Sequence, residues 1–133
     1  MLMVFLDANL VIYLVEQPAA FGPMVRARVT TVLAGGEHLA ISDLVRMECQ
    51  VGPWKRNNLV LLAQYVTFFQ SPAVNVLAIS PAVCDRAARI RAQHGFTPLD
   101  SIHLATAVEH RCTAFLTSDA RLKRFPDVLV EIL

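Results

Sequence analysis

Five short runs of mainly apolar residues most constrain how this chain folds. They cover residues 2–6 (LMVFL), 38–41, 75–79, 113–117 and 127–131. A strand with apolar side chains on both sides has no face for water, so it belongs inside a parallel sheet that is covered on both faces. The runs therefore predict buried parallel strands rather than a half-exposed antiparallel sheet.

Helical patterns separate these runs. We expect helices at residues 8–16, 23–34, 43–51, 56–69, 82–93, 98–110 and 119–124, with short breaks that contain Gly or Pro between the elements. Buried strands that alternate with helices indicate a sheet with helices on both faces. The prediction is an α/β fold, a three-layer sandwich, and the length of 133 residues suits a single domain over residues 1–133.

Composition excludes several classes of protein. No apolar run approaches the ~20 residues that span a bilayer, and no basic leader precedes Asp7, so we expect a cytoplasmic protein without a membrane partner. Cys49, Cys84 and Cys112 form no CxxC pair, and we interpret them as reduced packing residues. The net charge of +1 gives no general attraction to nucleic acid, so any such binding requires local clusters of basic residues.

Carboxylates stand where predicted strands end. Asp7 directly follows the first run, and Asp119 follows the fourth in the stretch TAFLTSDARL. In an open parallel sheet the binding crevice lies beyond the carboxyl ends of the strands, so we expect both side chains there. Asp100, in FTPLDSIHLATAVEH, opens the helix predicted at residues 98–110 and is expected at the same edge.

A fourth carboxylate, Glu48, lies inside a predicted helix on an otherwise apolar stripe. Such a side chain faces the sheet or its edge, where an unpartnered charge is costly. Asp7 and Asp119 have a simpler interpretation as helix N-caps, and Thr97 with Asp100 has the form of a capping box. Glu48 is too far into its helix to be a cap, so its position points to a site.

Several carboxylates in one crevice repel one another unless a cation lies among them. Oxygen ligands without a cluster of Cys or His favour a hard ion. If these four carboxylates converge, they therefore predict a site for Mg²⁺ or Mn²⁺.

Four segments together resemble the acidic motifs of the PIN-domain ribonucleases. They are LDANLVIYLVE, the helix around Glu48, LDSIHLATAVEH and FLTSDARLKRF, in this order. The compact length is similar to that of the VapC-type toxins of bacterial toxin-antitoxin pairs, and the resemblance covers residues 2–131. It implies a five-stranded parallel sheet with the first strand central, and an acidic pocket for Mg²⁺ or Mn²⁺ that cuts single-stranded or looped RNA.

The resemblance also assigns roles to residues. It makes Asp7, Glu48, Asp100 and Asp119 the four catalytic, metal-binding acids of the pocket. We expect Asp7 and Asp100 to hold the main ion, with Glu48 and Asp119 holding a second ion or orienting the attacking water. Polar positions beside the first and fourth acids are matched by Asn9 and Ser118, which we expect to give supporting hydrogen bonds.

Basic residues lie just past the fourth acid. Arg121, Lys123 and Arg124 follow Asp119, where we expect them to hold RNA phosphates. His103 lies one helical turn after the third acid, and we interpret it as a core or edge histidine rather than a catalytic one.

The implied function is a metal-dependent endoribonuclease, the toxin of a toxin-antitoxin pair. Its expected partners are RNA, a cognate antitoxin and a second copy of the chain in a homodimer. A housekeeping PIN nuclease in RNA processing and a non-catalytic interaction module stay open as alternatives. A phospho-acceptor receiver domain is a further α/β alternative, although Asp7 lacks the acidic neighbour that receiver domains place after their first strand.

Overall fold

The computed structural model describes residues 1–133 and contains one five-stranded sheet. All neighbouring strands are parallel, and their order is β3-β2-β1-β4-β5. The strands are β1 (Met3–Leu6), β2 (His38–Ser42), β3 (Val74–Leu77), β4 (Ala114–Thr117) and β5 (Val130–Ile132). The predicted parallel sheet is confirmed, and β1 is its central strand.

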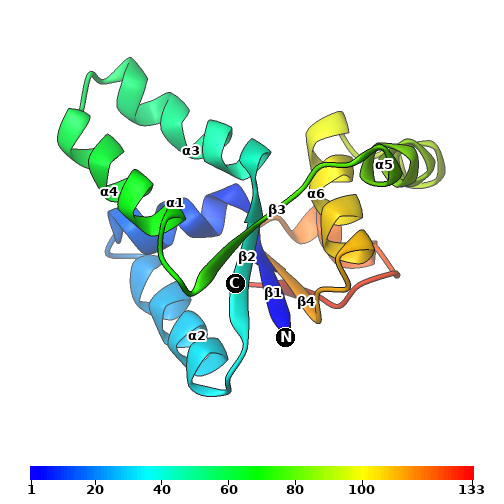
Figure 1. Ribbon diagram of the computed structural model, residues 1–133, viewed down its shortest axis with the longest axis horizontal. Helices are drawn as coiled ribbons and strands as arrows, with labels where there is room; N and C mark the ends of the chain where they lie inside the picture. The colour runs from blue at the N-terminus through cyan, green and yellow to red at the C-terminus, as the bar shows by residue number, and fades with distance from the viewer.

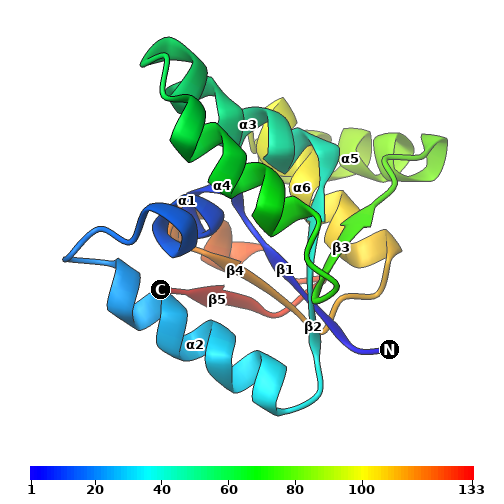
Figure 2. The same cartoon turned by 60° about the vertical axis from the view of Figure 1, so that its left-hand side comes forward.

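Helices cover both faces of this sheet. They are α1 (Ala8–Glu16), α2 (Gly22–Ala34), α3 (Asp43–Lys55), α4 (Leu59–Phe69), α5 (Pro81–His94) and α6 (Pro98–Glu109), followed by the 3₁₀ helix η1 (Ala120–Arg124). Figure 1 shows α1 to α4 on one side of the sheet and α5 and α6 on the other, which confirms the three-layer sandwich. Figure 2 shows α3 and α4 as an adjacent pair that extends beyond the sheet. None of these helices has both the length and the apolar character needed to cross a membrane.

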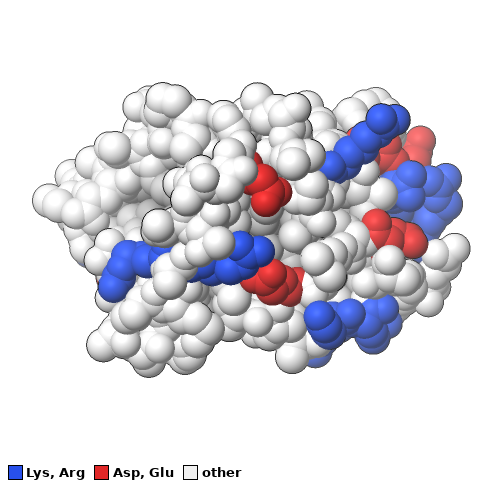
Figure 3. Space-filling model, turned by 90° about the horizontal axis from the view of Figure 1, so that it is seen from below, with Lys and Arg blue, Asp and Glu red and all other residues white.

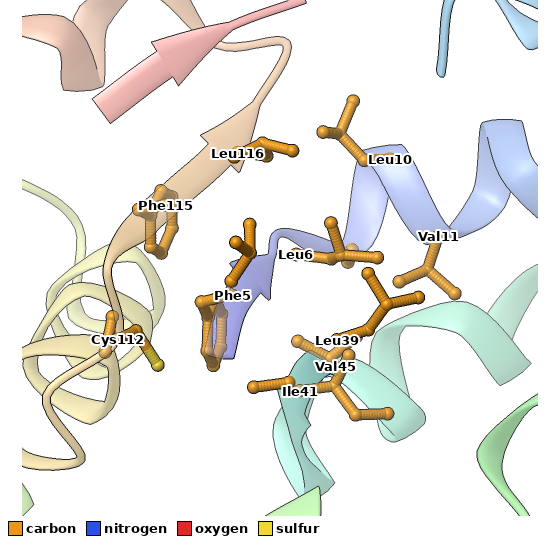
Figure 4. Close-up of a cluster of buried hydrophobic side chains, with 14 of the residues drawn as sticks. Phe5, Leu6, Leu10, Val11, Leu39, Ile41, Val45, Cys112, Phe115 and Leu116 are labelled. Carbon is orange, nitrogen blue, oxygen red and sulfur yellow. The ribbon is translucent and has the colours of Figure 1, made fainter. Parts of the chain in front are cut away.

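The core is densest around the central strand. Phe5 on β1 is opposite Phe115 on β4, and their rings stack with centroids 5.2 Å apart. Leu6 and Leu116 follow in register and are fully buried, as Figure 4 shows for the cluster around them. Side chains on both faces of β1 and β4 are thus removed from water, which is why these strands are apolar throughout.

Some boundaries differ from the prediction. The third helix continues through Gly52 and Pro53 to Lys55, although a proline lacks the N–H of a helical hydrogen bond. Pro53 is tolerated because it lies near the end of α3, where its missing N–H removes a single hydrogen bond, and because its ring is buried. The last strand begins at Val130 rather than at residue 127, since a bend at residues 127–128 precedes it.

The three cysteines are free, as expected. Cys49 and Cys112 are buried, but Cys84 is exposed, so its interpretation as a packing residue is wrong. Cys84 occupies a position on α5 that is not directed into the core.

Candidate active site

Asp7 lies at the junction of β1 and α1. Its N–H donates to the carbonyl of Leu116 over 2.9 Å, which extends the hydrogen bonding between β1 and β4 by one residue. Its Oδ1 accepts from the N–H of Ala8 at 2.8 Å, and its Oδ2 accepts from the hydroxyl of Thr117 at 2.7 Å. Both carboxylate oxygens are therefore held, and the residue is only 5% exposed.

Burial raises the pKa of Asp7 above its ordinary value, and the negative charge of Asp100 adds to this rise. His103 and the hydrogen bonds from Thr117 and Ala8 act in the opposite direction on this pKa. The charged form of Asp7 is thus disfavoured in the folded chain despite its two hydrogen bonds. A cation beside the carboxylate would offset this cost, which is the property expected of a metal ligand.

Thr117 joins the ends of β1 and β4. Besides donating to Asp7, its hydroxyl accepts from the N–H of Asp119 at 3.1 Å and lies 3.5 Å from Nδ2 of Asn9. The Oδ1 of Asn9 accepts from the N–H of Ser118 at 3.2 Å. Asn9 and Ser118 therefore lie together beside Asp7, and Ser118 takes part through its backbone. The end of the fourth predicted strand already placed Thr117 at this edge of the sheet, but no role was predicted for its hydroxyl.

Glu48 reaches the site from α3. Its Oε1 lies 2.5 Å from Nε2 of His103 on α6, and the same nitrogen lies 4.0 Å from Oδ1 of Asp7. Glu48 thus has the partner that its position on an apolar stripe required. The interpretation of His103 as a core histidine is right about its burial but missed its contact with a site acid. Its spacing of one turn after Asp100 was the available signal.

Asp100 occupies the first turn of α6. The side chain of Thr97 caps this helix by accepting from the N–H of Asp100 at 3.2 Å, but no return bond from Asp100 completes the capping box. The Asp100 carboxylate makes no hydrogen bond or ion pair within the chain. Its negative charge contributes to the raised pKa of Asp7, after the larger effect of burial.

Asp119 is held by a neighbour on its own segment. Its carboxylate accepts from the backbone N–H of Arg121 at 3.0 Å and pairs with the guanidinium, whose Nη2 lies 2.6 Å away. These bonds to Arg121 lower the pKa of Asp119. Asp119 also caps η1, so the cap interpretation describes this acid correctly.

This arrangement of acids beyond the carboxyl ends of β1 and β4 accompanies a match to a known family. The family model of the PIN domain matches residues 4–128, nearly the whole chain. The chain belongs to the PIN domain family. Its membership excludes the receiver-domain alternative.

Solved structures of proteins from several bacteria have a similar fold. VapBC2 from Rickettsia felis, bound to a DNA fragment from its promoter, aligns with a TM-score of 0.81 at 17% identity over 98% of both chains. VapC20 from Mycobacterium tuberculosis, a sarcin-ricin loop cleaving toxin, aligns with a TM-score of 0.72 at 14% identity, over 95% of this chain and 98% of that one. FitAcB from Neisseria gonorrhoeae gives 0.71 at 23% identity over 96% of each.

No curated protein sequence matches the chain significantly. The structural similarities are at low identity, so they establish the fold rather than the activity. The resemblance is thus confirmed for the PIN domain family and for the fold.

The four acids of this PIN domain do not form a complete metal-binding site. No group of three or more His, Cys, Asp or Glu side chains is arranged to hold a metal ion. The expected convergence is incomplete because the carboxylate of Asp119 pairs with Arg121, whereas His103 contacts Glu48 and lies close to Asp7. The carboxylate of Asp100 remains free, and with Asp7 it provides the hard oxygen donors that fit Mg²⁺ or Mn²⁺.

The basic residues of this PIN domain contact the protein itself. Arg121 is engaged with the fourth acid, Lys123 donates to the carbonyl of Val130 at 2.9 Å, and Arg124 donates to the carbonyl of His94 at 2.7 Å. On the face seen in Figure 3, Lys and Arg side chains form separate groups with acidic side chains among them. Phosphate binding by the three residues stays a prediction.

Proposed function

We propose that this PIN domain is a metal-dependent endoribonuclease and the toxin of a toxin-antitoxin pair. The observation that carries the proposal is Asp7, a buried carboxylate at the end of the central strand with a pKa raised by burial and by Asp100. A divalent ion supplies charge neutralisation on the phosphoryl oxygens and a basic water-derived nucleophile at neutral pH. In this proposal residues 1–133 form a single nuclease domain in the cytoplasm.

The proposed roles combine the family resemblance with the contacts of each side chain. Asp7 and Asp100 would hold the ion, Mg²⁺ or Mn²⁺. Thr117 fixes one oxygen of Asp7 and thereby sets the direction of the carboxylate. Glu48 keeps Oε2 without a protein partner, so that oxygen is free to accept a hydrogen bond from the attacking water or to bind a second ion.

The remaining proposed roles concern the edge of the site. Asp119 would bind a second ion or orient the attacking water. For either role its carboxylate would first leave the ion pair with Arg121. Asn9 and Ser118 keep the ends of α1 and β4 together through their mutual hydrogen bond. Arg121, Lys123 and Arg124 would bind phosphates near the site.

RNA is proposed as the substrate on the basis of family and fold. The chain belongs to the PIN domain family, and its fold is similar to that of VapC20, a sarcin-ricin loop cleaving toxin. Looped or single-stranded RNA is the substrate class that the resemblance to PIN-domain ribonucleases implies.

Two kinds of protein partner are proposed. The similar structures include toxin-antitoxin complexes, and on that basis we infer a cognate antitoxin for this chain. A homodimer is inferred from exposed apolar side chains on α3 and α4, among them Met47, Trp54 and Val60. Met47 and Trp54 also line a hollow of about 550 Å³ along α3, which leaves room for a partner's side chains.

RNA cleavage with controlled metal content tests the proposal. The purified chain is expected to cut RNA with Mg²⁺ or Mn²⁺ and to stop when chelator is in excess. Asp100→Asn should abolish cleavage, whereas Asp127→Asn should not, because it changes an exposed aspartate that is not one of the proposed site acids. Cleavage undiminished in excess chelator would overturn the proposal. A second experiment separates a toxin from a housekeeping nuclease. If expression of the chain arrests growth and co-expression of a neighbouring small gene relieves the arrest, the chain is a toxin.

A further inference from the structure

His103 is the side chain that lies between two of the site acids. Its Nε2 is 2.5 Å from Oε1 of Glu48 and 4.0 Å from Oδ1 of Asp7. The imidazole is 1% exposed and packs at a tilt against the ring of Phe5, with centroids 6.0 Å apart. The core therefore fixes the ring, and one nitrogen faces the carboxylates.

The other ring nitrogen determines where the proton lies. Nδ1 of His103 is buried and has no hydrogen-bond partner. A proton on Nδ1 would be a buried donor without an acceptor, which is unfavourable. The proton therefore lies on Nε2, and this N–H donates a hydrogen bond to Oε1 of Glu48.

Glu48 depends on this bond for its position. It is on a long, flexible side chain that is 27% exposed, and no other hydrogen bond or ion pair within the chain holds its carboxylate. Oε1 is occupied by His103, and Oε2 has no partner. Without the histidine, rotation about the side-chain bonds would let the carboxylate turn into solvent.

We propose that His103 is a positioning residue, which holds the Glu48 carboxylate beside Asp7 so that Oε2 is presented to the metal ion or to the attacking water. This inference rests on the proposed function, because it gives Glu48 its place in that site. Hydrogen-bond partners of metal ligands orient them, and their loss typically weakens metal binding by about 10–100-fold. The competing interpretation is a purely structural pair, in which Glu48 serves only to satisfy a buried histidine.

Mn²⁺ affinity of the full chain, measured by electron paramagnetic resonance, separates these interpretations without any cleavage assay. His103→Gln keeps an N–H donor near the place of Nε2 and should bind Mn²⁺ within about threefold of the wild type. His103→Asn carries its donor near Nδ1 instead, and should bind about tenfold more weakly or worse. His110→Asn is the matched control, because this histidine caps the C-terminal end of α6 and the hydrogen bond of its imidazole is to the carbonyl of Ala78, away from the site acids.

A double-mutant cycle then tests whether His103 acts through Glu48. If it does, Glu48→Gln combined with His103→Asn should bind Mn²⁺ no more weakly than Glu48→Gln alone. Thermal melts of each variant test whether it is folded. In the metal-free chain, ¹⁵N spectra of the imidazole should place the proton of His103 on Nε2, and a proton on Nδ1 would contradict the proposal.

The outcomes are distinguishable. Equal Mn²⁺ affinity in the wild type, His103→Gln and His103→Asn overturns the positioning role and leaves the proposed function standing. Additive losses in the double variant likewise overturn it, since His103 would then act independently of Glu48. A wild-type chain that binds no Mn²⁺ overturns the proposed function and this inference together.

Discussion

Replacing Asp7 with asparagine removes one charge and almost no volume. If Asp7 only caps α1, asparagine should serve equally well, and the free energy of unfolding should stay within ~0.5 kcal/mol of the wild type. The structure gives the cap a small part, because the carboxylate accepts from Ala8, the first helical residue, rather than from the second or third. Its other oxygen is directed to Thr117.

In the metal-free chain, two opposing effects determine how much Asp7→Asn changes the free energy of unfolding. Removing a buried charge recovers a desolvation penalty of about 1–3 kcal/mol. Replacing the charged acceptor of the Thr117 hydroxyl with a neutral amide loses about 1 kcal/mol. The Asp7→Asn variant should therefore be more stable than the wild type by about 1 kcal/mol at neutral pH.

The sign with pH follows from the raised pKa of Asp7. Below the ordinary value of 3.8 the side chain is protonated in both the folded and the unfolded chain, so its burial carries no charge penalty. As the pH rises from 3.8 to the raised folded pKa, the unfolded chain ionises first, and the wild type loses stability. Above the folded pKa the loss is complete and constant. The variant lacks this loss, so it should be more stable than the wild type at neutral pH and not at acid pH.

Chemical denaturation of both proteins at about pH 3 and at pH 7, in chelator, measures this difference. Addition of Mn²⁺ at pH 7 should reverse the order, because the wild type gains stability from the bound ion and the variant gains little. Equal stability of wild type and variant at both pH values, with an equal response to Mn²⁺, would refute the reasoning. Asp7 would then be a helix cap alone.

Three further predictions concern the metal, the partners and the fourth acid. Glu48→Gln should lower the rate of Mn²⁺-dependent RNA cleavage by at least tenfold, because Oε2 loses its charge, and an unchanged rate would remove Glu48 from the site. Light scattering should show a dimer at high micromolar concentration, whereas a monomer with no partner co-purifying from the native host would contradict the proposed interfaces. Arg121→Ala should raise the pKa of Asp119 towards its ordinary value in an NMR titration, because Arg121 is the main cause of its lowering. Arg89→Ala, which changes an exposed arginine of α5 that does not act on Asp119, should leave this pKa unchanged.

The layers of the fold were readable from local patterns. Fully buried strands need apolar side chains on both faces, and Phe5 and Leu6 show this directly. The order of the strands was not readable in this way, since apolar runs carry no information about which neighbours they pair with. The central place of β1 was implied only by the family resemblance. The continuation of α3 through Pro53 was missed because proline stops a helix locally, whereas its burial depends on the tertiary structure.

The candidate site likewise contains residues that the sequence predicted and contacts that it could not predict. Residues at strand ends, such as Asp7 and Asp119, were predicted because the edge of a parallel sheet collects them. The pairing of Glu48 with His103 joins residues 55 positions apart, which no local pattern specifies. The ion pair between Asp119 and Arg121 depends on side-chain rotamers in a short 3₁₀ helix and was likewise out of reach.

The central claim is that a divalent ion binds beyond the end of the central strand, between acids that the fold brings together. Anomalous diffraction from crystals soaked in Mn²⁺ tests this most directly, since it locates the ion itself. We predict a peak beside the carboxylates of Asp7 and Asp100, and its absence from Asp7→Asn crystals treated in the same way. A wild-type chain that cleaves RNA in Mn²⁺ but shows no peak at these carboxylates would contradict the claim.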